Sequence, residues 1–153
     1  MGEVIRSDLV VVGAGVAGLT AALVAAADGL SVTVLTKGRA WEASGGEQST
    51  STFYAQGGIA VVEPDNPEDS VALHLADTLA AGAGLTDPLA TEPILADGWE
   101  AVAQLVGWGA DFDTGSDGRF LRTREGGHSV RRIIHAGGDA TGARVQQALA
   151  TAV

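Results

Sequence analysis

Residues Asp8–Lys37 read DLVVVGAGVAGLTAALVAAADGLSVTVLTK and contain the clearest pattern in the chain. The apolar run Leu9–Val12 is typical of a buried parallel strand. It leads directly into a glycine-rich loop, after which apolar and alanine residues continue to Ala27 at helical spacing. Gly29 predicts the end of this helix, and Ser31–Leu35 predicts a second apolar strand. The segment therefore predicts a strand–helix–strand unit within about 30 residues.

The loop between the first strand and the helix has the pattern GxGxxG. Its members are Gly13, Ala14, Gly15, Val16, Ala17 and Gly18. In this context the pattern is typical of a dinucleotide site: Gly13 allows a tight turn, Gly15 lets the backbone approach a pyrophosphate, and Gly18 lets helix and strand pack closely. The N–H groups at the start of the helix would then face the phosphates. The alternative is a glycine-rich turn that binds no ligand.

One part of the usual dinucleotide pattern is missing. The second strand should end in an Asp or Glu for the ribose hydroxyls, but Thr36, Lys37 and Gly38 stand there. The nearest acid, Asp28, precedes the strand. A lysine favours a phosphate, so the spacing alone leaves FAD, NAD and NADP open.

Composition excludes several classes of protein. The chain has 153 residues, 46 % of them hydrophobic, which is enough for one domain with a core. Its net charge of −10 argues against binding to nucleic acid or to an anionic membrane. It has no cysteine, no apolar run long enough to span a membrane and no recognisable export signal. We expect a cytoplasmic protein without a metal site.

Two segments follow the strand–helix–strand unit. Gly38–Thr50 is polar and rich in Gly and Ser, which predicts a solvated loop. Ser51–Val62 reads STFYAQGGIAVV and combines two aromatic residues with a Gly-Gly pair before an apolar run. Gly57 and Gly58 permit either close approach to a ligand or a structural turn, and both interpretations remain open.

Helix signals recur in the second half of the chain. Asn66 is a candidate N-cap for a helix that ends near Gly82, and His74 is expected to be an ordinary residue of that helix. A final helix is predicted to run to the last residue, with Asp139 or Thr141 as its cap.

The second informative segment, Leu121–Gly142, reads LRTREGGHSVRRIIHAGGDATG. Its ionisable side chains cluster around a Gly-Gly pair, in a chain that is otherwise acidic. They are Arg124, Glu125, His128, Arg131 and Arg132. Arginine forks pair with carboxylates and phosphates, so the cluster could meet a dicarboxylate or a pyrophosphate. An internal salt-bridge loop is the alternative.

These motifs resemble a known family. GAGVAG followed by STFYAQGGIAVV resembles the flavoproteins of the succinate dehydrogenase, fumarate reductase and L-aspartate oxidase family, and TREGGHSxRRIxHAxxDATG is similar to its L-aspartate oxidases. The resemblance implies an α/β fold, a Rossmann-like FAD-binding domain. Succinate-oxidising members usually carry the histidine of the covalent flavin link where this chain has Ser51. The resemblance therefore implies FAD that is held non-covalently.

The resemblance also implies roles for individual residues. Gly13–Gly18 would hold the pyrophosphate, and Lys37 would lie near the adenosine half of FAD. Glu125 would orient the substrate near its amino group. The flavin and its ribityl chain would lie against one segment, namely Ser51, Thr52, Phe53, Tyr54, Ala55, Gln56, Gly57 and Gly58.

The implied reaction is oxidation of L-aspartate to iminoaspartate by hydride transfer to FAD. Oxygen or fumarate would reoxidise the flavin, and the product would pass to quinolinate synthase for NAD biosynthesis. One alternative is a flavoprotein of the fumarate reductase or succinate dehydrogenase type. The other is a truncated dinucleotide-binding module without catalytic activity.

The resemblance covers residues 1–153 as the N-terminal part of an FAD-binding domain, which would be incomplete at its C-terminus. The remaining strands of that domain, a capping domain and a C-terminal helical domain would lie downstream. The arginine that acts as base and the substrate-binding histidines would also lie there. We therefore expect the chain by itself to lack oxidase activity.

Overall fold

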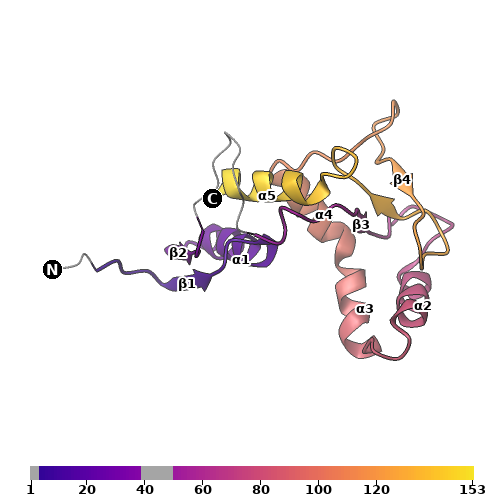
Figure 1. The fold of residues 1–153 in the computed structure, drawn as a ribbon, viewed down its shortest axis with the longest axis horizontal. Helices are drawn as coiled ribbons and strands as arrows, with labels where there is room; N and C mark the ends of the chain where they lie inside the picture. Colours follow the sequence, from indigo (N-terminus) through magenta and orange to yellow (C-terminus); the bar gives the residue numbers. More distant parts are fainter. Residues whose placement is uncertain (1–3, 39–49) are drawn as a thin grey trace.

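The structure, a computed structural model, describes residues 4–38 and 50–153. Its first part is a βαβ unit made of β1 (Leu9–Val12), α1 (Val16–Ala27) and β2 (Val32–Leu35) (Figure 1). The two strands are parallel and pair along their whole length. The predicted strand–helix–strand unit is confirmed, with one difference at the start of the second strand.

Local hydrogen bonds fix the boundaries of this unit. Ser31, predicted as the first residue of the second strand, instead donates from its hydroxyl and its N–H to the Asp8 carboxylate, at 2.6 and 2.9 Å. These bonds from Ser31 lower the pKa of Asp8. Gly29 (φ 85°) ends α1 as predicted, because the N–H groups of Gly29 and Leu30 donate back to carbonyls of the last turn.

A second sheet lies further along the chain. It contains β3 (Ile59–Ala60), β4 (Arg122–Thr123) and β5 (Ile133–Ile134), all antiparallel, in the order β3-β5-β4. β5 is therefore central and links two segments that are far apart in sequence. This arrangement brings the STFYAQGGIAVV segment next to the end of the basic segment.

Four further helices complete the described chain. They are α2 (Val71–Gly82), α3 (Pro88–Ala96), α4 (Gly98–Gly107) and α5 (Thr141–Ala152). Figure 1 shows α5 lying along α1, whereas α2 and α3 form a pair that extends away from the βαβ unit. Because α5 packs on α1, the last helix helps to position the glycine loop.

The predicted N-cap of α2 is wrong. α2 begins at Val71 with Ser70 as its cap, whose hydroxyl accepts from the Leu73 N–H at 3.1 Å. Asn66 lies earlier, and its side chain accepts from the N–H of Glu68 within a turn. An Asn side chain can satisfy a turn as readily as a helix end, and here the turn takes it.

The predicted caps of the final helix are also not used. Ala140 is the N-cap of α5, and its methyl side chain makes no capping hydrogen bond. The Thr141 hydroxyl instead accepts from the buried N–H of Ala136 at 3.1 Å, and Asp139 is exposed. The hydroxyl thus stabilises the turn before α5 rather than its first N–H groups.

The core lies between α1, α4, α5 and β5. It is built from aliphatic side chains that include Leu19, Val102, Leu105, Ile134 and Leu149. Three aromatic rings extend it through edge-to-face contacts, namely Trp99, Phe112 and Phe120. Burial of Leu19 on one side of α1 fixes that helix against α5, which leaves its N-terminus at the edge of the core.

Some expectations concern features outside or absent from the described residues. The loop predicted over Gly38–Thr50 falls almost wholly within residues 39–49, which lie outside them. Within 4–38 and 50–153, no helix has the length and apolar character needed to cross a membrane. The same ranges contain no group of three or more His, Asp or Glu side chains arranged to hold a metal.

Candidate functional site

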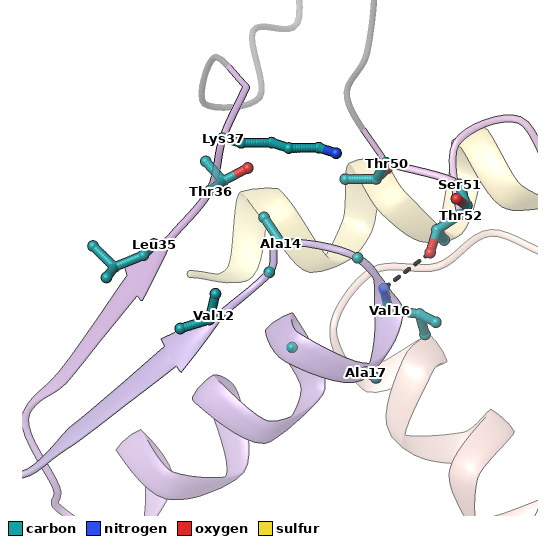
Figure 2. A pocket seen from close by; sticks show the side chains of 13 residues that line it. Val12, Ala14, Val16, Ala17, Leu35, Thr36, Lys37, Thr50, Ser51 and Thr52 are labelled. Atoms are coloured by element: carbon teal, nitrogen blue, oxygen red, sulfur yellow. Dashed lines mark hydrogen bonds between the residues drawn. The ribbon is translucent and has the colours of Figure 1, made fainter.

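A pocket of about 470 Å³ opens where β1 and β2 end and α1 begins. The carboxyl ends of parallel strands are where ligands bind in sheets of this kind. Three segments of the described chain line the pocket: the glycine loop with the end of β1, the end of β2, and residues Thr50–Thr52 (Figure 2). The lining residues are Val12, Gly13, Ala14, Gly15, Val16, Ala17, Gly18, Leu35, Thr36, Lys37, Thr50, Ser51 and Thr52.

Two of the glycines are required by the backbone itself. Gly13 has φ 116°, a conformation that other residues rarely adopt. A Cβ on Gly18 would lie 1.9 Å from the carbonyl oxygen of Gly13, so α1 could not approach the loop as it does. Gly15 has more room, since the nearest atom to its Cβ position is the Thr52 hydroxyl at 3.2 Å.

The N-terminus of α1 is capped by a residue from another part of the chain. The Val16 N–H donates to the Thr52 hydroxyl at 3.0 Å, across 36 positions of sequence (Figure 2). The N-cap residue itself, Gly15, has no side chain to do this. Within the described residues the structure records no acceptor for the N–H groups of Ala17 and Gly18. Helix N–H groups of this kind can bind an anion such as a phosphate.

Gln146 on α5 supports the glycine loop, a role that was not predicted from the sequence. Its side-chain amide donates to the Ala14 carbonyl at 2.8 Å, and its oxygen is 3.1 Å from the Thr50 hydroxyl. Gln146 is 3 % exposed. The sequence does contain a signal for this role. Gln146 follows Val145 and stands three residues before Leu149, so a polar residue occupies a core position of an amphipathic helix.

Lys37 is exposed at the end of β2, and its side chain extends across the pocket toward Thr50 (Figure 2). Among the lining residues that fall within 4–38 and 50–153, it is the only charged one. The pocket therefore combines unpaired helix N–H groups with one ammonium group. Both features favour a negatively charged ligand.

The predicted flavin segment divides into two parts. Ser51 and Thr52 line the pocket, whereas Phe53, Tyr54, Ala55, Gln56, Gly57 and Gly58 do not. These six residues run toward α5 and β3. The Gly142 N–H donates to the Ala55 carbonyl at 2.9 Å, and a Cβ on Gly142 would lie 2.0 Å from the Thr52 carbonyl oxygen.

The Gly-Gly pair also has two different environments. A Cβ on Gly58 would lie within 3 Å of Ile133, Ile134 and His135, whereas Gly57 has no atom within 4 Å of that position. Gly58 is thus required by its close contact with the side chains of Ile133 and His135 and with the carbonyl oxygen of Ile134. Gly57 has open space on that side.

Glu125 lies outside the pocket, two residues after the end of β4. Its Oε1 atom accepts from the Thr123 hydroxyl at 3.1 Å and faces the Nε2 atom of His135 at 2.9 Å. The carboxylate is about half exposed, with 49 % of its side-chain surface accessible. It is therefore held at one oxygen while the side chain remains open to a ligand.

Arg132 forms an internal ion cluster, so this arginine of the basic segment pairs with the protein's own carboxylates. Its guanidinium binds both oxygens of Asp69, at 3.0 and 2.7 Å, and one oxygen of Asp77 at 2.6 Å. Asp77 also accepts from the N–H and hydroxyl of Ser129, both at 2.8 Å. The salt-bridge alternative thus holds for Arg132, whereas Arg131 is exposed.

The cluster shifts the acidity of its members. The Ser129 N–H, followed by the Arg132 guanidinium, lowers the pKa of Asp77 from 3.8 to about 2. Burial opposes the charge of Arg132, but the carboxylates of Asp69 and Asp77 outweigh it and raise its pKa. Burial, followed by the nearby guanidinium, lowers the pKa of His74, a buried residue of α2.

Comparison with known proteins gives a consistent result. A family described as FAD binding domain matches residues 8–153. The L-aspartate oxidase of Mycobacterium tuberculosis (strain ATCC 25618 / H37Rv) is 61 % identical over 143 residues, which cover 94 % of this chain and 26 % of that protein. The L-aspartate oxidase of Streptomyces coelicolor is 49 % identical and covers 99 % and 25 %. The chain thus spans about a quarter of the length of these curated relatives.

Solved structures agree on the fold. The Mycobacterium smegmatis Sdh1 complex matches with a TM-score of 0.83 at 34 % identity, over 95 % of this chain and 23 % of the matched chain. A quinol-fumarate reductase with menaquinol matches with a TM-score of 0.84 at 29 % identity, over 99 % and 25 %. The predicted α/β architecture of an FAD-binding domain is confirmed.

Proposed function

This chain belongs to the FAD binding domain family, and from that premise we propose that it forms the N-terminal, FAD-binding part of an enzyme that oxidises L-aspartate to iminoaspartate. The observation that carries the proposal is the 61 % identity with an L-aspartate oxidase across 94 % of the chain. The activity of the whole enzyme requires residues from the other three quarters of such a protein.

The pocket at the start of α1 suits the pyrophosphate of FAD. Ala17 and Gly18 offer N–H groups at the positive end of a helix, and the glycine backbone allows a ligand to approach closely. We propose that Lys37 lies near the adenosine half. Ser51 and Thr52 contact the cofactor at the pocket, and Phe53–Gly58 continue along its flavin half.

FAD supplies a hydride acceptor when it is bound. The role of this chain in the reaction is to orient the partners. Glu125 accepts a hydrogen bond from the ammonium group of L-aspartate, which fixes the substrate for transfer. Oxygen or fumarate accepts the electrons afterwards, and iminoaspartate passes to quinolinate synthase.

We also propose that the cofactor is not covalently linked through Ser51. Its hydroxyl stands where the resemblance implies a histidine in succinate-oxidising members, and a serine at this position cannot form that bond. The test is the visible spectrum of the complete gene product, expressed with FAD, before and after acid precipitation. Flavin in the supernatant supports the proposal, and flavin in the pellet contradicts it.

Substrate choice is tested on the same preparation under anaerobic conditions. Addition of L-aspartate should bleach the flavin absorbance, and succinate at the same concentration should not. Bleaching by succinate alone would assign the enzyme to the succinate dehydrogenase type. A protein that binds no flavin would contradict the proposed function altogether.

A further inference from the structure

His135 is the residue outside the predicted site that contacts Glu125 most directly. Its Nε2 atom lies 2.9 Å from Oε1 of Glu125, and the Thr123 hydroxyl donates to the same oxygen at 3.1 Å. A carboxylate oxygen only accepts hydrogen bonds, so Nε2 must carry a hydrogen whether the ring is neutral or charged. Both contacts use one oxygen. For the other, Oε2, the structure records no partner within the described residues.

The His135 ring is fixed against the segment that precedes β3. A Cβ on Gly58 would lie 2.8 Å from Nε2, so the ring packs directly on the bare backbone of that glycine. The backbone of His135 is fixed as well: it directly follows β5, and its carbonyl accepts from the N–H of Asp113 at 2.8 Å. With 17 % of its side chain exposed, the ring has little room to move away from Glu125.

The loop that carries Glu125 is anchored at its other end by the Arg132 cluster. Ser129 binds the Asp77 carboxylate through both its N–H and its hydroxyl, and the Arg132 guanidinium holds that carboxylate in place. The His128 N–H donates to the Glu125 carbonyl at 3.2 Å within the same loop. With the backbone held, the remaining freedom of Glu125 is rotation of its side chain, and the contacts to Oε1 restrict that rotation.

We propose that His135 is a positioning residue for the substrate: together with Thr123 it holds Oε1 of Glu125, so that Oε2 is presented to the ammonium group of the amino-acid substrate. This inference rests on the proposed function, because it assumes that Glu125 binds that ammonium. It explains why a glycine stands at position 58, where a side chain would displace the imidazole from the carboxylate. The His135 ring also connects the segment Ser51–Gly58 to Glu125, because it contacts Gly58 on one side and the Glu125 carboxylate on the other.

The test compares His135→Leu with His135→Gln in the complete gene product loaded with FAD. Leucine is similar in size but donates no hydrogen bond, whereas glutamine retains an N–H donor. Two activities are measured on each variant: oxidation of L-aspartate, and reduction of fumarate with reduced methyl viologen as the electron donor. Fumarate has no ammonium group, so it reports on FAD and on the dicarboxylate site without Glu125's proposed contact.

We expect His135→Leu to lower kcat/KM for L-aspartate by about 10- to 100-fold, the effect of losing a hydrogen bond to a charged group, mainly through a higher KM. Fumarate reduction should stay within about twofold of the wild type, and His135→Gln should recover L-aspartate oxidation to within about threefold. In a Glu125→Gln background, His135→Leu should have no further effect on KM. Equal losses of both activities, or an unchanged KM for L-aspartate, would overturn the proposal.

Thr123→Val provides a second variant should His135→Leu fail to fold, since residue 123 is exposed. It removes the other donor to Oε1 and should raise the KM for L-aspartate by about 3- to 10-fold without changing fumarate reduction, whereas Thr123→Ser should restore the wild-type value. No effect of Thr123→Val would also count against the proposal. A wild-type flavoprotein that does not oxidise L-aspartate would remove the proposed function before any variant is compared.

Discussion

The glycine loop at the start of α1 and the ion cluster around Arg132 are held together in different ways. The loop is shaped by backbone: a positive φ at Gly13, the missing side chain of Gly18, and N–H groups at a helix end. The cluster is shaped by side chains, because a guanidinium with 0 % side-chain exposure joins two carboxylates from residues more than 50 positions away.

This difference separates a binding surface from a structural anchor. Backbone N–H groups at the loop remain open to a ligand, so the loop can bind without rearranging. At the cluster, the donors of Arg132 already meet Asp69, Asp77 and His128. The positive end of α1 at the loop is therefore available to a ligand, whereas the charge of Arg132 is neutralised within the cluster. We expect substitutions in the cluster to act mainly on stability, and substitutions in the loop to act mainly on FAD affinity.

The largest effect should come from Arg132→Met. The substitution leaves Asp69, which has 0 % side-chain exposure, without its counter-ion, and removes one partner of Asp77. Removal of one member of a buried ion pair typically costs about 3–5 kcal/mol. We expect a loss of this size in the free energy of unfolding, measured by denaturant titration.

Arg131→Met is the matched control, because Arg131 is adjacent in sequence but exposed. It should change the free energy of unfolding by no more than about 0.5 kcal/mol. If the two variants were equally stable, the cluster would not be a structural anchor, and the distinction between the two regions would fail.

The next largest effect is expected for Gly18→Ala. The added methyl group would lie 1.9 Å from the Gly13 carbonyl oxygen, so the loop or the helix must shift. Overpacking of this kind costs about 1–3 kcal/mol. Because the shift moves the N–H groups of the pocket, FAD affinity should fall by about tenfold or more, measured by quenching of flavin fluorescence.

Gly107→Ala in α4 is the control for Gly18→Ala. No atom lies within 4 Å of the added Cβ, and the position is helical. Replacement of a helical glycine by alanine is stabilising by up to about 1 kcal/mol. FAD affinity should not change, and a loss at Gly107 as large as that at Gly18 would show that the assay reports general destabilisation.

The same contrast decides how much could be predicted from the sequence. The βαβ unit was predictable because its signals are local: an apolar strand, GxGxxG, and a glycine that ends the helix lie within Asp8–Lys37. The cap from Thr52, the support from Gln146 and the two carboxylate partners of Arg132 were not predictable, since each of these contacts joins residues at least 36 positions apart. Periodicity and spacing carry no information about such pairs.

Acid should weaken the cluster. The pKa of Asp77 is lowered to about 2, so its contribution to stability is complete above its ordinary value of 3.8 and is lost as the pH falls through 2. The lowered pKa of Asp113, bound by the N–H groups of Gly138 and Gly137, acts in the same direction. The lowered pKa of His74 adds a loss that begins as the pH falls through 6.5.

We therefore expect the folding equilibrium constant to fall by roughly tenfold between about pH 4 and pH 2 because of Asp77 alone, a value that allows for screening by solvent. The measurement is the urea midpoint at a series of pH values. Asp77→Asn removes the titrating carboxylate, so the variant should start less stable but change less over this interval. An identical pH dependence in both proteins would contradict the assignment.

The smallest effect on stability is expected for a substitution of Thr52. At this residue the glycine loop resembles the Arg132 cluster, because a side chain from a distant part of the sequence holds it. This side chain caps α1 from a distant part of the chain, so the glycine loop, which Gln146 also holds at the Ala14 carbonyl, depends on long-range side-chain contacts as well. Thr52→Val keeps the shape but removes the acceptor for the Val16 N–H, and loss of a cap typically costs about 1 kcal/mol. Thr52→Ser retains the hydroxyl and should behave like the wild type.

Hydrogen exchange at Val16 is the sharpest measurement, because faster exchange in Thr52→Val alone would locate the effect at this bond. Unchanged exchange would mean that the Thr52 cap does not stabilise the start of α1, and the contrast with the Arg132 cluster would then be sharper, because Gln146 would be the remaining long-range side chain that holds the loop.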